Sequence, residues 1–130
     1  MASVALQTWR TIAAAELDQI QAAHAAVGGR GRGRRYATLQ LNHAYTMLLS
    51  SQFQRFCRDL HSEVAAFLAQ NGAVGAFKLV ALTALTQSRK LDTGNPNEGN
   101  IGSDFARLGM TDLWDDVNAR HGYNQRRRKS

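Results

Sequence analysis

The chain has 130 residues, of which 44% are hydrophobic and 20% are charged, and these values suit a single globular domain covering residues 1–130. The composition excludes collagen-like, wholly disordered and disulfide-stapled chains. No run of about 18 apolar residues indicates a membrane-spanning helix. The start of the chain lacks the pattern of a secretory signal, and the single cysteine, Cys57, permits no internal disulfide. We therefore expect a cytoplasmic protein without a membrane anchor.

The net charge of +6 comes from two short basic runs. The remaining 8 basic and 10 acidic residues form a slightly acidic body. Cations gathered in exposed segments attract phosphate without reading sequence, and such binding weakens with salt. These runs therefore predict contacts with RNA, and solvated charges without a ligand are the alternative. The predicted nucleic-acid-binding residues are Arg30, Arg32, Arg34, Arg35, Arg126, Arg127, Arg128 and Lys129.

Two long helices are predicted in the first part of the chain. Residues 3–27 carry apolar side chains mostly three and four positions apart, and Gly28-Gly29 ends that pattern. Residues 28–35 then read as a basic, flexible Gly/Arg loop. Residues 36–70 hold helical spacing for the longest stretch in the chain, and Asn71-Gly72 ends it. We expect this second helix to be the central element of the fold.

The rest of the chain predicts shorter elements. Residues 73–90 favour a third helix, although Leu79–Leu82 also suits a short strand. Residues 92–102 hold the only proline and read as a loop. Ser103 is the expected cap of a short helix closed by Gly109, and Thr111 that of a second one closed near Gly122.

The basic tail at residues 123–130 resembles the start of a further helix. With no apolar residue after Tyr123, so short a helix cannot anchor itself. We therefore expect the natural protein to continue beyond Ser130.

The sequence thus predicts an all-α helical bundle with a long N-terminal helix, a long central helix, a third helix and two short C-terminal helices. Its core is expected to consist of the large apolar residues on the helical stripes. These are Trp9, Ile12, Ile20, Tyr45, Leu48, Leu49, Phe53, Phe56, Leu60, Val64, Phe67, Phe77, Leu108 and Trp114.

Sequence patterns for catalysis or metal binding are weak. The four histidines never stand three or four residues apart, so no zinc motif is present, and we expect neither a metal nor another cofactor. The glycines of residues 94–99 lack the lysine that a phosphate-binding loop requires. Cys57 lies at the edge of an apolar stripe and is expected to be a packed, inert thiol.

The segment LNHAYTMLLSSQFQRFCRDL, residues 41–60, resembles the core helix of HEPN (higher eukaryotes and prokaryotes nucleotide-binding) domains. This resemblance implies an all-α bundle with two long antiparallel helices, often dimeric. It also implies a metal-independent ribonuclease of toxin or phage-defence type, or a non-catalytic relative that binds RNA or nucleotides.

The catalytic signature of that family is an arginine followed after four to six residues by a histidine, usually on a late helix. Only Arg55 and His61 have this spacing here. They stand six positions apart on one predicted helix, so their side chains point about 120° apart around its axis. We therefore interpret both as polar residues flanking the apolar stripe. The family's late helix would follow Arg128, so no catalytic residue is predicted within this chain.

Two functions follow as hypotheses. The first is a non-catalytic, HEPN-like domain that associates with RNA and serves as the scaffold of a ribonuclease. The alternative is a helical module for dimerisation or for binding another protein, without nucleic acid.

Overall fold

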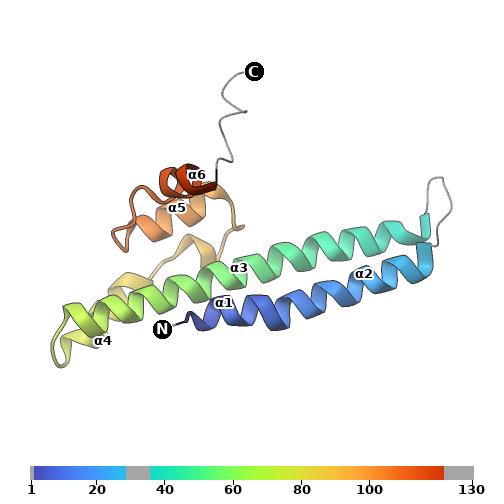
Figure 1. Cartoon of the computed structure of the whole chain (residues 1–130). Helices are drawn as coiled ribbons and strands as arrows, with labels where there is room; N and C mark the ends of the chain where they lie inside the picture. Colours follow the sequence, from blue (N-terminus) through green and yellow to red (C-terminus); the bar gives the residue numbers. More distant parts are fainter. Residues whose placement is uncertain (1, 29–35, 122–130) are drawn as a thin grey trace, which may run out of the picture. The chain divides into compact units, whose positions relative to one another are not determined.

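The computed structural model describes residues 2–28 and 36–121, and within these residues the chain is all-α, as predicted (Figure 1). The chain divides into two compact units, Met1–Glu63 and Val64–Ser130, and the longest helix contributes to both. The elements in order are α1 (Val4–Thr8), a π-helical turn η1 (Trp9–Ala13), α2 (Ala14–Gly28), α3 (Tyr36–Gly72), α4 (Phe77–Thr86), a 3-10 turn η2 (Lys90–Asp92), α5 (Glu98–Ala106) and α6 (Leu113–His121).

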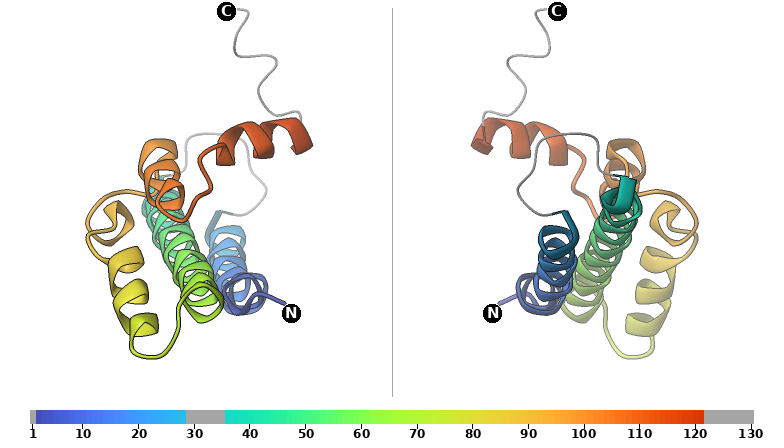
Figure 2. Two further views of the ribbon diagram at one scale, coloured as in Figure 1. Left: turned by 90° about the vertical axis from the view of Figure 1, so that its left-hand side faces the viewer. Right: turned by 90° about the vertical axis from the view of Figure 1, so that its right-hand side faces the viewer.

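In the first unit, α1, η1 and α2 form one continuous helical stretch that runs antiparallel to the first part of α3 (Figures 1 and 2). Polar contacts set the register at one end, where Glu63 accepts hydrogen bonds from Ser3 Oγ at 2.7 Å and from the Ala5 amide at 2.6 Å. Further along, Gln52 donates a hydrogen bond to the Glu16 carboxylate. The predicted helices 3–27 and 36–70 are both confirmed.

A widened turn interrupts the first helical stretch at η1, where the Ala14 amide bonds to the Trp9 carbonyl five residues earlier. Trp9 packs against the rings of Phe53 and Phe56, with ring centroids 6.1 and 5.6 Å apart. Ala13 is buried beside them. Ile12, a predicted core residue in the same widened turn, is 53% exposed.

Helix α3 buries every fourth residue along its middle and C-terminal part, namely Cys57, His61, Ala65 and Ala69. The predicted core stripe, with Phe56, Leu60 and Val64, lies one position earlier and is only half-buried. Small side chains allow helices to approach closely, which explains why the buried stripe carries alanines and the larger residues flank it. The helix itself was predicted correctly, and its buried face was not.

In the second unit, α4 is shorter than the predicted helix 73–90. Gly75, with φ of +59°, forms the turn before it, and Ser88, with φ of +55°, lies in the left-handed region just after it. An L side chain costs energy in that region, so the helix cannot continue through Ser88. Leu79–Leu82 is helical, which decides between the two alternatives that the sequence left open.

Helix α5 begins six residues earlier than a Ser103 cap would place it, so the predicted loop 92–102 is wrong in its second half. The Asn97 side chain accepts a hydrogen bond from the Asn100 amide at 2.8 Å and is the actual N-cap. Gly109, with φ of +88°, closes the turn after α5, as predicted. Helix α6 is also confirmed. The Asp116 amide donates a hydrogen bond to the Asp112 carbonyl, so Asp112, and not the predicted cap Thr111, directly precedes the helix.

Burial corrects most of the predicted core. Of the predicted residues only Leu108 is buried. Those that are half-buried are Trp9, Ile20, Tyr45, Leu48, Phe53, Phe56, Leu60, Val64 and Trp114. Those that are exposed are Ile12, Leu49, Phe67 and Phe77. Besides Leu108, the buried apolar residues of the described chain are Ala5, Ala13, Leu17, Cys57, Ala65, Ala69, Leu91, Ile101 and Phe105.

Candidate functional site

The predicted RNA-contacting residues lie outside the described part of the chain. They are Arg30, Arg32, Arg34, Arg35, Arg126, Arg127, Arg128 and Lys129. The same holds for the predicted start of a further helix at residues 123–130. Two other regions, which sequence reasoning did not single out, are better candidates for a site.

The first candidate is the outward surface of α4, a helix with no buried residue. We define the α4 face as its exposed residues Phe77, Leu79, Val80, Thr83 and Ala84, which fall within one arc of about 160° around the helix. No member of the face is charged. The Thr83 hydroxyl donates to the Leu79 carbonyl at 2.9 Å, so its hydrogen bond is made within the helix. The whole arc is therefore free of unsatisfied polar side chains.

The other side of α4 is joined to the end of α3. Lys78 lies outside the exposed arc, and its Nζ donates a hydrogen bond to Gln70 Oε1 at 3.1 Å. Around the turn, Phe67 and Val74 are also largely exposed. Together with Phe77, Leu79 and Val80 they form what we call the hairpin patch, whose residues are each 63% to 83% exposed.

The second candidate is a cavity of about 220 Å³ between α2 and α3, within the first unit. Helix α2 contributes three residues to its lining, and helix α3 contributes another three. The lining residues are Ile20, Gln21, His24, Leu41, Asn42 and Tyr45. None of these described lining residues is Asp, Glu, Lys or Arg.

Arg55 and His61, the pair with the spacing of the catalytic signature, do not share an environment. Arg55 is exposed and makes an ion pair with Asp59, with Arg55 Nε and Asp59 Oδ2 3.6 Å apart. His61 is fully buried on the inner stripe of α3, so its interpretation as a flanking polar residue is wrong. Whether a histidine on a helix is buried depends on which side of that helix faces inward. The sequence pattern favoured the neighbouring stripe, which carries Phe56, Leu60 and Val64.

Cys57 is a packed thiol, as expected. It is buried on the same stripe as His61, and this burial raises its pKa to about 11. Because the thiolate is the reactive form, a thiol with so high a pKa is a poor nucleophile at neutral pH. The described residues also contain no group of three or more His, Cys, Asp or Glu side chains that could hold a metal ion.

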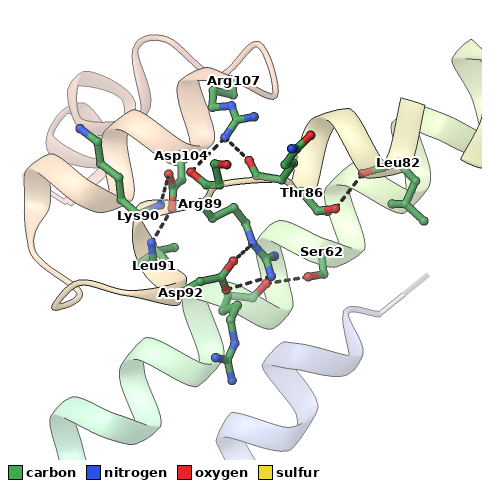
Figure 3. Close-up of polar contacts among 12 residues, drawn as sticks. Ser62, Leu82, Thr86, Arg89, Lys90, Leu91, Asp92, Asp104 and Arg107 are labelled. Atoms are coloured by element: carbon green, nitrogen blue, oxygen red, sulfur yellow. Dashed lines mark hydrogen bonds and ion pairs between the residues drawn. The ribbon is translucent and has the colours of Figure 1, made fainter. Parts of the chain in front are cut away.

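Polar side chains of the second unit stabilise its backbone (Figure 3). The buried Asp104 accepts hydrogen bonds from the amides of Lys90 and Leu91 at 2.9 and 2.8 Å. Arg107 donates to the carbonyls of Ala84 and Gln87 at the end of α4, at 3.0 and 2.6 Å. These groups bind backbone atoms at helix ends, so their role is structural.

Sequence signals for the two candidate sites existed but were indirect. The uncharged run of residues 79–86 indicated a helix, and its outward face could have been recognised only by knowing which side packs. The cavity could have been predicted only by knowing how two helical segments about 20 residues apart are aligned, and the periodicity of one segment does not give that alignment.

None of the described helices is long and apolar enough to span a membrane. Comparison with protein-family models, with curated proteins and with solved structures finds no match to this chain.

Proposed function

We propose that this chain is a helical association module whose α4 face, together with the rest of the hairpin patch, binds the same surface of a second copy. The observation that carries this proposal is the absence of any buried residue in α4, a helix rich in Leu, Val and Phe. A helix normally turns such residues toward a core, because burying apolar surface is the main favourable term of its folding. A second copy of the chain would bury the apolar residues of α4 that are exposed here.

The exposed area supports a dimer. The five residues of the hairpin patch together expose on the order of 600–700 Å², given typical areas of apolar side chains and their exposed fractions. This approaches the roughly 800 Å² that each partner contributes to a standard protein interface.

The chemistry of the face supports a copy of the same chain as the partner. In a two-fold dimer the same patch meets itself, so any charge near the axis would oppose its own kind. The α4 face has no charged residue, and its one hydroxyl is bonded within the helix. Two such faces can therefore meet without burying a charge or an unsatisfied polar group.

Sedimentation or light scattering of the full chain over a concentration series tests this proposal. We expect a dimer that dissociates on dilution and that becomes monomeric in the variant Phe77→Glu. The matched control is Met47→Glu, which changes an equally exposed apolar residue of α3 and should leave the dimer intact. A wild-type chain that stays monomeric at about 100 µM would overturn the proposal, because we expect a specific dimer to have a dissociation constant below that concentration.

RNA association is a second candidate function, supported by the concentration of eight of the 16 cations in two short runs. Each phosphate contact to a single strand contributes about −0.7 to the slope of log affinity against log salt. Replacing Arg30, Arg32, Arg34 and Arg35 with Gln should therefore flatten that slope by up to about 3 in a filter-binding titration. An unchanged slope would remove these arginines from the interface.

The HEPN-like identity and the role of a non-catalytic ribonuclease scaffold belong to this second candidate. An RNA cleavage assay in the presence of a chelator tests them. We expect no cleavage by the 130-residue chain, because Arg55 is exposed while His61 is buried. Cleavage abolished by Arg55→Ala or His61→Ala would instead show that this pair is catalytic.

A further inference from the structure

The two helices that line the cavity contribute the same kinds of side chain in the same order. On each helix the lining residues stand at positions i, i+1 and i+4, and they are an aliphatic residue, a carboxamide and a ring. On α2 these are Ile20, Gln21 and His24, and on α3 they are Leu41, Asn42 and Tyr45. The cavity is therefore bounded by two aliphatic groups, two carboxamides and two rings.

This set of groups suits a flat heteroaromatic ligand. Aromatic side chains stack on the faces of bases in a way that tolerates many sequences. Carboxamides of Asn and Gln present a donor and an acceptor side by side, a pattern that matches the N6 and N7 edge of adenine. The aliphatic residues Ile20 and Leu41 add apolar contacts to the ring faces.

Size and charge narrow the ligand further. The volume of about 220 Å³ is below the 300–1,000 Å³ of pockets for drug-sized molecules, so it suits one ring system better than a whole nucleotide. None of the lining residues that the structure describes is Lys or Arg, whereas phosphate recognition relies on such cations. The sugar and phosphate of a nucleotide would therefore lie outside it.

We propose that this cavity binds a nucleobase, with adenine preferred, either from a free nucleoside or from single-stranded RNA. The inference goes beyond self-association and shares no residue with the α4 face. Tyr45 and His24 stack on the base, and Asn42 and Gln21 bond to its edge. The proposal does not depend on the basic runs, because a free nucleoside carries no phosphate.

Saturation-transfer NMR with the full chain and adenosine at millimolar concentration tests the proposal. The H2 and H8 protons of the base are expected to receive more saturation than the ribose protons. Tyr45→Ala and Asn42→Ala should each weaken binding about tenfold, the effect of losing one stacking ring or one carboxamide pair. Tyr45→Phe keeps the ring and should bind like the wild type.

Two variants serve as matched controls. Gln19→Ala and Gln40→Ala each remove an exposed carboxamide from the same helices without touching the lining, and they should bind adenosine normally. Asn42 is itself exposed, so its replacement should leave the fold intact even where Tyr45→Ala loosens it. Equal binding by Asn42→Ala and Gln40→Ala would overturn the site, as would the absence of any saturation transfer to adenosine.

Two further ligands identify the source of the base. A short oligoadenylate weakened by Asn42→Ala to the same extent as adenosine would show that a base of RNA occupies the cavity. An oligoadenylate unaffected by that change would assign the cavity to free nucleosides. Ribose 5-phosphate should not bind, and binding of it in place of adenosine would overturn the proposal. The arginine-to-Gln variant of residues 30–35 should lose RNA affinity but keep adenosine binding, which separates this inference from the second candidate function.

Discussion

The two units of this protein are stabilised in different ways. The first unit, Met1–Glu63, joins two long helical stretches through a ring cluster of Trp9, Phe53 and Phe56 and a few polar contacts. The second unit is built largely from helices of ten residues or fewer together with the end of α3, and side chains such as Asp104 and Arg107 bind their free backbone groups. Short helices are marginal on their own, so the second unit should depend more on single polar side chains.

The sharpest test of this difference is Asp104→Ala. It leaves the part-buried Lys90 amide and the buried Leu91 amide without their carboxylate acceptor. We expect the free energy of unfolding of the second unit to fall by about 4 kcal/mol, since two charge-assisted hydrogen bonds are lost in a buried place. Urea unfolding followed by circular dichroism measures this loss. Asp115→Ala, at an exposed position on α6, is the control and should change the stability little.

Trp9→Ala tests the ring cluster of the first unit. The indole packs against two phenylalanine rings and is only half-buried, so we expect a loss of about 3 kcal/mol, carried mainly by the first unit. Hydrogen exchange of backbone amides resolves which unit opens. If Trp9→Ala accelerated exchange more in α5 than in α2, the separate stabilisation of the two units would be contradicted.

Gly102→Ala tests close packing within the second unit. A Cβ at Gly102 would lie 2.9 Å from Trp114 Nε1, which donates a hydrogen bond to the Glu98 carbonyl. Displacing the indole should cost about 2 kcal/mol, and a shifted indole N–H signal in NMR would show it. Gly99→Ala is the matched control on the same helix, because its Cβ meets only Asn97 Oδ1 at 3.5 Å. It should be neutral or slightly stabilising.

The smallest expected effect concerns the Cys57 thiol. Burial raises its pKa to about 11 from an ordinary value near 9, so the folded state holds its proton more tightly than the unfolded state. The contribution of the Cys57 thiol to the free energy of unfolding is fully present below pH 9 and is lost as the pH rises toward 11. At pH 10 we expect a loss of about 1 kcal/mol. Because other groups also titrate there, the measurement is the difference between the wild type and Cys57→Ala.

Helix positions could be read from the sequence more reliably than burial. The period of the apolar residues and the glycines at 28, 72 and 109 located the long helices and the end of α5. The start of α5 was missed because the Asn97 cap was assigned to a loop. The core was missed because the largest residues were taken as the most buried, whereas Ala65 and Ala69 lie on the buried stripe.

The candidate sites show the same limit. The basic runs could be identified from charge alone, and they fall outside the described residues. The cavity brings Tyr45 beside residues of α2 that lie about 20 positions earlier, and the α4 face appears only once its inner side is known.

The sequence by itself therefore determined the helical periods, most of the helix ends and the segregation of charge, because each depends on residues close together in the chain. Only the tertiary structure decided which stripe of α3 is buried, which face of α4 stays outside and where a cavity opens. Burial depends on the register and the distance between helices, and these depend on the fit of side chains that meet from distant parts of the chain.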